Sequence, residues 1–134
     1  MPISVAIVED NVEICEMLTR TVERASSLRF MQSFPSGEEA LEKLPVLKPD
    51  VVIMDIQLPG MTGVECTQAL KAQVPGIQVL VFTVFGDSDL VFKALEAGAS
   101  GYLLKRTPRQ AIVDAVKDVW FGGMTPELVA GVWL

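Results

Sequence analysis

The chain has 134 residues, half of them apolar, and its 17 acidic and 11 basic side chains give a formal net charge of −6. The absence of histidine excludes a Ser-His-Asp relay, a histidine general base and a His-ligated metal site, and two cysteines cannot form a four-ligand zinc site. The apolar runs are far shorter than the ~20 residues that span a bilayer, and the chain does not start with the basic residues of a signal peptide. It also lacks a basic run that could follow a phosphate backbone. We therefore expect one cytoplasmic domain that contacts neither membrane nor nucleic acid.

Short apolar runs rich in β-branched residues alternate with amphipathic stretches, a pattern typical of a parallel sheet with helical crossovers. The predicted strands are Ile3–Val8, Leu28–Phe34, Val51–Met54, Val79–Phe82 and Ser100–Leu104. The first, third and fourth are almost entirely apolar, as strands covered on both faces are. Leu28–Phe34 also contains Arg29, Gln32 and Ser33, so we place it at an edge of the sheet.

The segments that follow the strands carry apolar residues at helical spacing. Their stripes consist of Cys15, Leu18, Val22 and Ala25; Cys66, Leu70 and Val74; Val91, Ala94 and Leu95; and Ile112, Ala115, Val116 and Val119. Glu38–Leu44 is predicted as a short helix that ends at Pro45. Thr107 is predicted as the N-cap of the last helix, with Pro108 in its first turn.

The strand–helix pattern ends near Phe121, where Gly122 and Gly123 interrupt it. We therefore predict one domain over residues 1–121. Residues 122–134 are predicted as a linker and the start of another helix, with Thr125 as its cap and Pro126 as its first residue.

Polar residues stand at the carboxyl ends of four predicted strands. These are Glu9 and Asp10 after the first, Asp55 after the third, Thr83 after the fourth and Lys105 after the fifth. Ligands of open parallel α/β sheets bind beyond such ends, where the strand order reverses. Asp10 and Asp55 meet only if the first and third strands are neighbours. The flavodoxin-like (βα)5 doubly wound fold, with strand order 2-1-3-4-5, places them so, and we adopt it as the expected fold.

Three carboxylates in one place repel each other unless a proton or a cation offsets their charge. Mg²⁺ is a hard cation whose usual ligands are one or two carboxylates, waters and phosphate oxygens. Lys105 adds a point charge and Thr83 a hydroxyl donor, and both suit a phosphoryl group. Without histidine or an activated serine, the nucleophile that such a site offers is a carboxylate, which would form an aspartyl-phosphate.

Four segments carry these residues in order, namely IVEDN, VVIMDIQLPGMTGVE, VLVFT and ALEAGASGYLLKRT. Together they resemble a response-regulator receiver domain of two-component systems, over roughly residues 3–121. The resemblance implies that Asp55 is the phosphoacceptor and receives its phosphoryl group from the phosphohistidine of a sensor histidine kinase. It also implies a Mg²⁺ site in which Asp10 binds the ion directly and Asp55 also takes part. Glu9 would act mostly through water, and Gln57 would offer its backbone carbonyl.

The same resemblance assigns roles to the residues around the phosphoryl group. Thr83 and Lys105 match the hydroxyl and the lysine that bind it. Tyr102 matches the aromatic residue whose inward rotation accompanies the movement of Thr83 on activation. The side chain of Gln57 lies where the family tunes loss of the phosphoryl group. Val84 departs from the small residue that many receivers have there, so we expect it to slow small phosphodonors and water.

The segments GASGYLLKRT and GGMTPELVAGVWL are similar to the NarL/LuxR-type subfamily. The similarity implies a transcription regulator in which the receiver switches a C-terminal helix-turn-helix DNA-binding domain that this chain does not include. We expect a regulatory domain rather than a turnover enzyme. A homodimer on phosphorylation is expected through the fourth helix, fifth strand and fifth helix, or through the first helix.

Two other functions remain open at this point. A receiver-like chain could act without phosphate as a docking or dimerisation module, which Val84 permits. A Mg²⁺-dependent phosphohydrolase also uses an aspartate nucleophile, but such enzymes place a second acid two residues later, where this chain has Gln57.

Three residues also have purely structural interpretations. Tyr102 suits simple packing in an edge strand. Cys15 and Cys66 fall in the apolar stripes of two different helices. Because those helices are expected on opposite faces of the sheet, we predict that both cysteines pack in the core without forming a disulfide.

Overall fold

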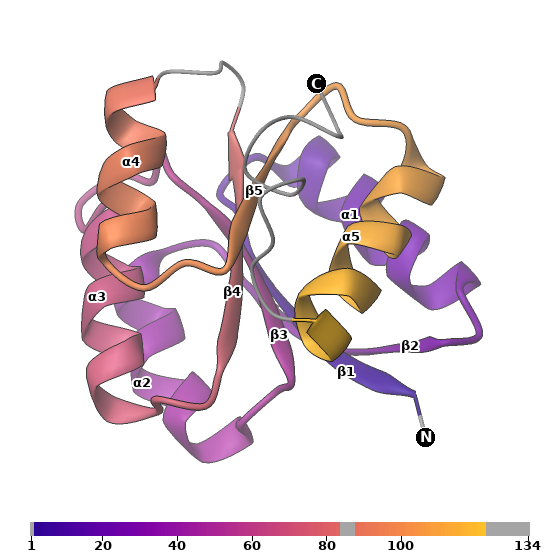
Figure 1. Ribbon diagram of the computed structural model, residues 1–134, viewed down its shortest axis with the longest axis horizontal. Helices are drawn as coiled ribbons and strands as arrows, with labels where there is room; N and C mark the ends of the chain where they lie inside the picture. Colours follow the sequence, from indigo (N-terminus) through magenta and orange to yellow (C-terminus); the bar gives the residue numbers. More distant parts are fainter. Residues whose placement is uncertain (1, 84–87, 123–134) are drawn as a thin grey trace.

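A parallel sheet forms the centre of the computed structural model, which describes residues 2–83 and 88–122 (Figure 1). The described strands are β1 Ile3–Val8, β2 Leu28–Phe34, β3 Val51–Asp55, β4 Gln78–Thr83 and β5 Gly101–Leu104. They lie in the order β2-β1-β3-β4-β5, so the expected flavodoxin-like order is confirmed. β3 and β4 each run one residue further than predicted, and Asp55 and Thr83 therefore belong to the sheet itself.

Helices cover both faces of this sheet. Those in the described ranges are α1 Val12–Arg24, α2 Gly37–Leu47, α3 Gly63–Gln73, α4 Ser88–Glu96 and α5 Arg109–Gly122. α1 and α5 lie on one face, and α2, α3 and α4 lie on the other (Figure 1). The chain is thus doubly wound, and the carboxyl ends of all strands point to one edge.

Side chains along each strand alternate between two apolar cores. Ile7, Ile53 and Leu103 are buried on the side of α1 and α5, in what we call the α1/α5 core. Val8 and Met54 are buried on the other side, in the α2–α4 core. Burial on both faces explains why β1, β3 and β4 are almost continuously apolar. β2 lies at an edge of the sheet, as its polar residues predict.

The two cysteines lie where the helical stripes place them. Cys66 is fully buried in the α2–α4 core, Cys15 packs half-buried against the α1/α5 core, and both thiols are free. The prediction of core positions on opposite faces without a disulfide is confirmed. Burial and, to a lesser degree, the charge of Glu38 raise the pKa of Cys66 to about 12. Its thiol therefore stays protonated and donates to the carbonyl oxygen of Gly37 (3.6 Å).

α2 extends past the end that the sequence predicts. The helix continues to Leu47, with Pro45 inside it. A proline removes one backbone donor, but in the last turn this loss affects a single hydrogen bond. Lys48 then closes the helix from a left-handed conformation (φ 48°), and its N–H donates to the carbonyl oxygen of Leu44 (2.8 Å). The prediction that Pro45 ends the helix was therefore wrong.

The start of α5 also differs from the prediction. Thr107 is buried, and its hydroxyl makes no hydrogen bond to any described residue, so it does not cap the helix. α5 begins at Arg109, and the carbonyl oxygen of Pro108 accepts the N–H of Ile112 (3.1 Å). Pro108 thus precedes the first turn. Because proline has no N–H, this position leaves no extra backbone donor unpaired.

Some predictions lie outside the described residues. These concern Val84 and the helix expected after residue 123, with Thr125 and Pro126. The last described helix ends at Gly122, one residue beyond the predicted domain boundary. Among residues 2–83 and 88–122, no helix combines the length and the apolar character needed to cross a membrane.

Candidate functional site

Strand alternation directs three polar side chains to one face of the sheet. Glu9, Asp55 and Lys105 each stand two positions after a residue of the α1/α5 core. Side chains two positions apart in a strand point to the same face. All three are therefore directed toward the side covered by α1 and α5, at the carboxyl edge of the sheet.

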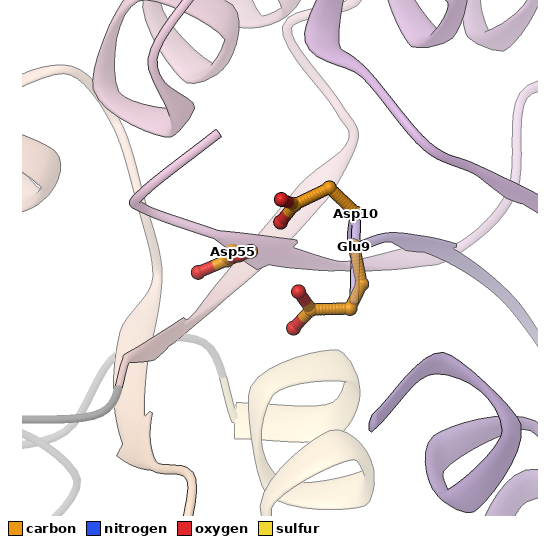
Figure 2. A group of neighbouring side chains, drawn as sticks. All are labelled: Glu9, Asp10 and Asp55. Atoms are coloured by element: carbon orange, nitrogen blue, oxygen red, sulfur yellow. The ribbon is translucent and has the colours of Figure 1, made fainter. Parts of the chain in front are cut away.

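Glu9, Asp10 and Asp55 form a cluster of carboxylates. Figure 2 shows the first two projecting from the end of β1, beside the end of β3 that carries Asp55. One carboxylate oxygen of each residue lies within 4.8 Å of the others. Glu9 and Asp55 are only 3% and 2% exposed, whereas Asp10 is exposed to solvent. The cluster is thus assembled as the sequence predicts, with one member open to solvent.

The ammonium group of Lys105 bridges the two buried carboxylates. Its Nζ lies 3.0 Å from Oε1 of Glu9 and 3.2 Å from Oδ1 of Asp55. The side chain of Lys105 is 12% exposed, so solvent screens these ion pairs little. The backbone fixes the position of Lys105, because its N–H donates to the carbonyl oxygen of Thr83 (2.7 Å) at the end of the β4–β5 ladder.

Glu9 occupies an environment that disfavours its charge. Burial is the largest cause that raises its pKa, from 4.5 to about 7, and the hydrogen bond and charge of Asp55 act in the same direction. The N–H of Asn11, which donates to Oε2 (3.2 Å), and the ammonium of Lys105 act in the opposite direction. Near neutral pH the carboxyl group of Glu9 can therefore lose its proton when a cation binds the cluster, at little cost in free energy.

The cluster has the donors that suit a hard divalent cation. Carboxylate oxygens are the ligands that Mg²⁺ prefers. Oε1 of Glu9 is buried and has no well-directed hydrogen bond within the described chain, although the ammonium of Lys105 lies near it. The single ammonium offsets only part of the negative charge of the three carboxylates, and a divalent cation would offset the rest. On this ground the residues present fit a Mg²⁺ ion.

The loop between β3 and α3 (residues 56–62, the β3–α3 loop) shapes the site from one side. The N–H of Gln57 donates to Oδ1 of Asp55 (3.2 Å), and the N–H of Gly63 donates to the carbonyl oxygen of Ile56 (2.8 Å). A Cβ at residue 63 would lie 2.0 Å from the carbonyl oxygen of Asp55, so only glycine lets α3 begin this close. Sequence reasoning missed Gly63. Its signal is a glycine at the start of a helix, where glycine lowers helix propensity.

Thr83 and Tyr102 lie on the other face of the sheet. Thr83 is buried at the end of β4, and by alternation its side chain faces the side of Val81, which belongs to the α2–α4 core. Tyr102 packs half-buried against the same core, paired with Val81 in the β4–β5 ladder. Asp55 pairs with Phe82, the residue before Thr83. Thr83 therefore ends the strand next to the one that carries Asp55, while its side chain faces the opposite side of the sheet.

The sequence also matches known proteins. The family model of the response regulator receiver domain matches residues 5–117. The chain belongs to this family. It is a receiver domain of a two-component response regulator, as the four sequence segments indicate, and hence a regulatory domain. Receiver domains bind Mg²⁺ at an acidic cluster, and Glu9, Asp10 and Asp55 form such a cluster in this chain.

Relatives of the receiver domain fall in the subfamily that the sequence resembles. The transcriptional regulatory protein LnrK of Bacillus subtilis (strain 168) is 42% identical over 130 residues, which cover 96% of this chain and 59% of LnrK. A LuxR-family two-component response regulator from Aurantimonas sp. SI85-9A1 superposes with a TM-score of 0.87 at 29% identity, over 96% of this chain and 93% of that one. The signal receiver domain of NarL from Mycobacterium tuberculosis gives a TM-score of 0.86 at 30% identity, over 90% and 98% of the chains. The chain spans between 51% and 59% of the length of the first curated relatives.

Proposed function

We propose that this receiver accepts a phosphoryl group on Asp55 from a sensor histidine kinase, with Mg²⁺ held by the carboxylate cluster. The observation that carries the proposal is the buried pair of Glu9 and Asp55 with the ammonium of Lys105 within 3.2 Å of both. A carboxylate oxygen of Asp55 can act as a nucleophile, and the ammonium of Lys105 beside it offers positive charge to a phosphoryl group. The chain contains no histidine that could accept the phosphoryl group instead.

The residues of the cluster divide the work of the transfer. A carboxylate oxygen of Asp55 forms the bond to phosphorus while the bond from phosphorus to the imidazole nitrogen of the kinase breaks, and its electron pair stays on nitrogen. Asp10 and Asp55 through their carboxylates, Glu9 through water and Gln57 through its backbone carbonyl would hold Mg²⁺. Bound there, the ion supplies positive charge that offsets the negative oxygens of the phosphoryl group. The side chain of Gln57, two residues after the acceptor, would affect attack by water.

The new phosphoryl group would change the surface of the domain. Phosphorylation adds about −1.5 to −2 charge and three acceptor oxygens. Lys105 would move from the carboxylates toward these oxygens, and the hydroxyl of Thr83 would donate to them. Tyr102, on the same face as Thr83, would fill the space that Thr83 leaves. The surface formed by α4, β5 and α5 would change as a result, with a free energy of coupling between phosphorylation and this change of roughly 1–3 kcal/mol. Either this surface or the exposed face of α1 would form a homodimer or contact an output domain.

A longer protein would convert this change into a signal. We place the receiver in residues 1–121 of a cytoplasmic transcription regulator, with 122–134 leading to a C-terminal helix-turn-helix DNA-binding domain. LnrK supports this proposal, because it is a transcriptional regulatory protein and this chain covers only 59% of its length. The similarity to a LuxR-family response regulator points the same way.

Asp55→Asn is expected to abolish phosphoryl incorporation, because asparagine keeps the shape of the side chain but offers no anionic oxygen as nucleophile. The measurement is the intact mass of the chain after incubation with acetyl phosphate and Mg²⁺. We expect up to one phosphoryl group per wild-type chain, and none when EDTA removes the metal. Asp118→Asn, which alters an exposed carboxylate on α5, is the matched control and should behave as wild type.

Other results of this experiment would point to other functions. Undiminished incorporation in Asp55→Asn would refute the assignment of the acceptor. A wild-type chain that binds neither phosphate nor beryllofluoride in Mg²⁺ would favour the docking or dimerisation module. Steady hydrolysis of a phosphomonoester beyond one equivalent would favour a phosphohydrolase.

A further inference from the structure

The N-terminus of α2 contacts the β3–α3 loop through a carboxylate that the phosphoryl transfer does not use. Oε2 of Glu38 accepts the N–H of Met61 (3.0 Å), a residue 23 positions later in the chain. Gly60 precedes Met61 with φ +72°, and a Cβ at residue 60 would lie 2.6 Å from the same oxygen. The carboxylate of Glu38 is thus fitted against a turn that glycine alone adopts without strain.

A second set of contacts keeps α2 close to this loop. A Cβ at Gly37 would lie 3.3 Å from Cβ of Cys66 and 3.4 Å from Cγ of Met61, so α2 closely approaches both the loop and α3. The thiol of Cys66 also donates to the carbonyl oxygen of Gly37 (3.6 Å). These contacts fix the backbone from which the side chain of Glu38 reaches Met61.

The other end of the same loop lies in the carboxylate cluster. The N–H of Gln57 donates to Oδ1 of Asp55, and the hydrogen bond from Gly63 to Ile56 closes the loop across its base. A loop of residues 56–62 that is closed at its base has little freedom to move at one end alone. Gln57 and Met61 thus lie near the two ends of one short loop, and the N–H of each donates to a carboxylate.

We propose that Glu38 is a positioning residue of the metal and phosphoryl site, which holds the β3–α3 loop so that the backbone of Gln57 is set correctly beside Asp55. The inference rests on the proposed function, because it assigns the backbone carbonyl of Gln57 to Mg²⁺. Glu38 acts as a hydrogen-bond acceptor for Met61, and its charge is secondary. A glutamine, whose amide oxygen also accepts a hydrogen bond, should therefore replace it, whereas an alanine should not.

The test measures Mg²⁺ affinity by isothermal titration calorimetry, and stability in EDTA by urea unfolding, for the same set of variants. We expect Glu38→Ala to weaken Mg²⁺ binding about three- to tenfold, the loss expected from one hydrogen bond that is coupled to the site. Glu38→Gln should bind Mg²⁺ within about twofold of wild type, since it keeps the acceptor. Glu39→Ala removes the neighbouring exposed carboxylate of the same helix and should leave the affinity unchanged.

Each outcome decides between the two proposals. Weaker binding in Glu38→Ala with recovery in Glu38→Gln supports the positioning role. Equal affinity in wild type and Glu38→Ala, with or without a loss of stability, overturns the inference alone. Equal weakening in Glu38→Gln and Glu38→Ala also overturns it, because charge would then be the cause. A wild-type chain that binds no Mg²⁺ overturns the proposed function together with the inference.

Discussion

Gly63→Ala is expected to lower the free energy of unfolding by about 3 kcal/mol and to weaken Mg²⁺ binding by at least about tenfold. The added Cβ would stand 2.0 Å from the carbonyl oxygen of Asp55 and 2.7 Å from Cα of Ile56. Both atoms belong to the backbone, so no side-chain rotation relieves the overlap. Either the end of β3 moves, which displaces the proposed acceptor Asp55, or α3 moves, which shifts the β3–α3 loop beside it. Urea unfolding and calorimetric titration with Mg²⁺ measure the two effects.

A matched glycine separates this overlap from the general cost of changing a glycine. A Cβ at Gly76, in the turn between α3 and β4, would meet no atom within 4 Å. Gly76 also does not have a positive φ. Gly76→Ala should therefore change the free energy of unfolding by no more than about 0.5 kcal/mol. A Gly63→Ala variant as stable as the Gly76→Ala control would show that α3 does not need this close approach.

The acidic cluster and Lys105 could be predicted from the sequence because local patterns determine where they lie. Each of the β1, β3 and β5 strands is an apolar run, and the first charged residue after it marks its carboxyl end. Parallel strands bring these ends to one edge. The alternation of the strands then directs Glu9, Asp55 and Lys105 to the same face, and this follows from spacing alone. The order of the strands came from the fold type, because spacing does not determine which strands are neighbours.

Features that depend on tertiary contacts were not accessible in this way. Proline usually ends a helix, but α2 continues past Pro45 to Leu47. Leu44 is buried in this helix, and Lys48 caps it in a left-handed conformation. Thr107 is a favourable cap by type, yet its side chain is buried away from the helix N–H groups. The bond from Met61 to Glu38 joins residues 23 positions apart, so no short-range pattern indicates it.

The carboxylate of Glu9 should make the metal-free domain less stable as pH rises. Its pKa is about 7 in the folded chain and 4.5 as the ordinary value. Between these values the folded state binds more protons than the unfolded state, so the free energy of unfolding falls with rising pH. The stabilisation is complete below pH 4.5 and lost above about pH 7, a difference on the order of 3 kcal/mol. Urea unfolding in EDTA at pH 5 and pH 8 measures it.

Glu9→Gln should remove this pH dependence, because glutamine resembles the protonated acid and does not titrate. In EDTA the variant should match wild type near pH 5 and exceed its stability near pH 8. Glu42→Gln changes an exposed carboxylate of α2 and should retain the wild-type slope. If Glu9→Gln is instead the less stable protein at pH 8, the ion pair with Lys105 outweighs the cost of burying the charge.

Addition of Mg²⁺ should reverse the order of the two proteins at pH 8. A cation that binds only the folded state stabilises it by an amount that grows with the ratio of its concentration to the dissociation constant. Wild type offers the anionic carboxylate of Glu9, which would hold the ion through water, whereas the amide of glutamine carries no negative charge. The variant should therefore gain less stability from Mg²⁺ than wild type does. If Mg²⁺ stabilises both proteins equally, Glu9 does not belong to the metal site. If Mg²⁺ makes wild type the more stable protein, Glu9 favours binding of the ion and lowers the stability of the metal-free domain.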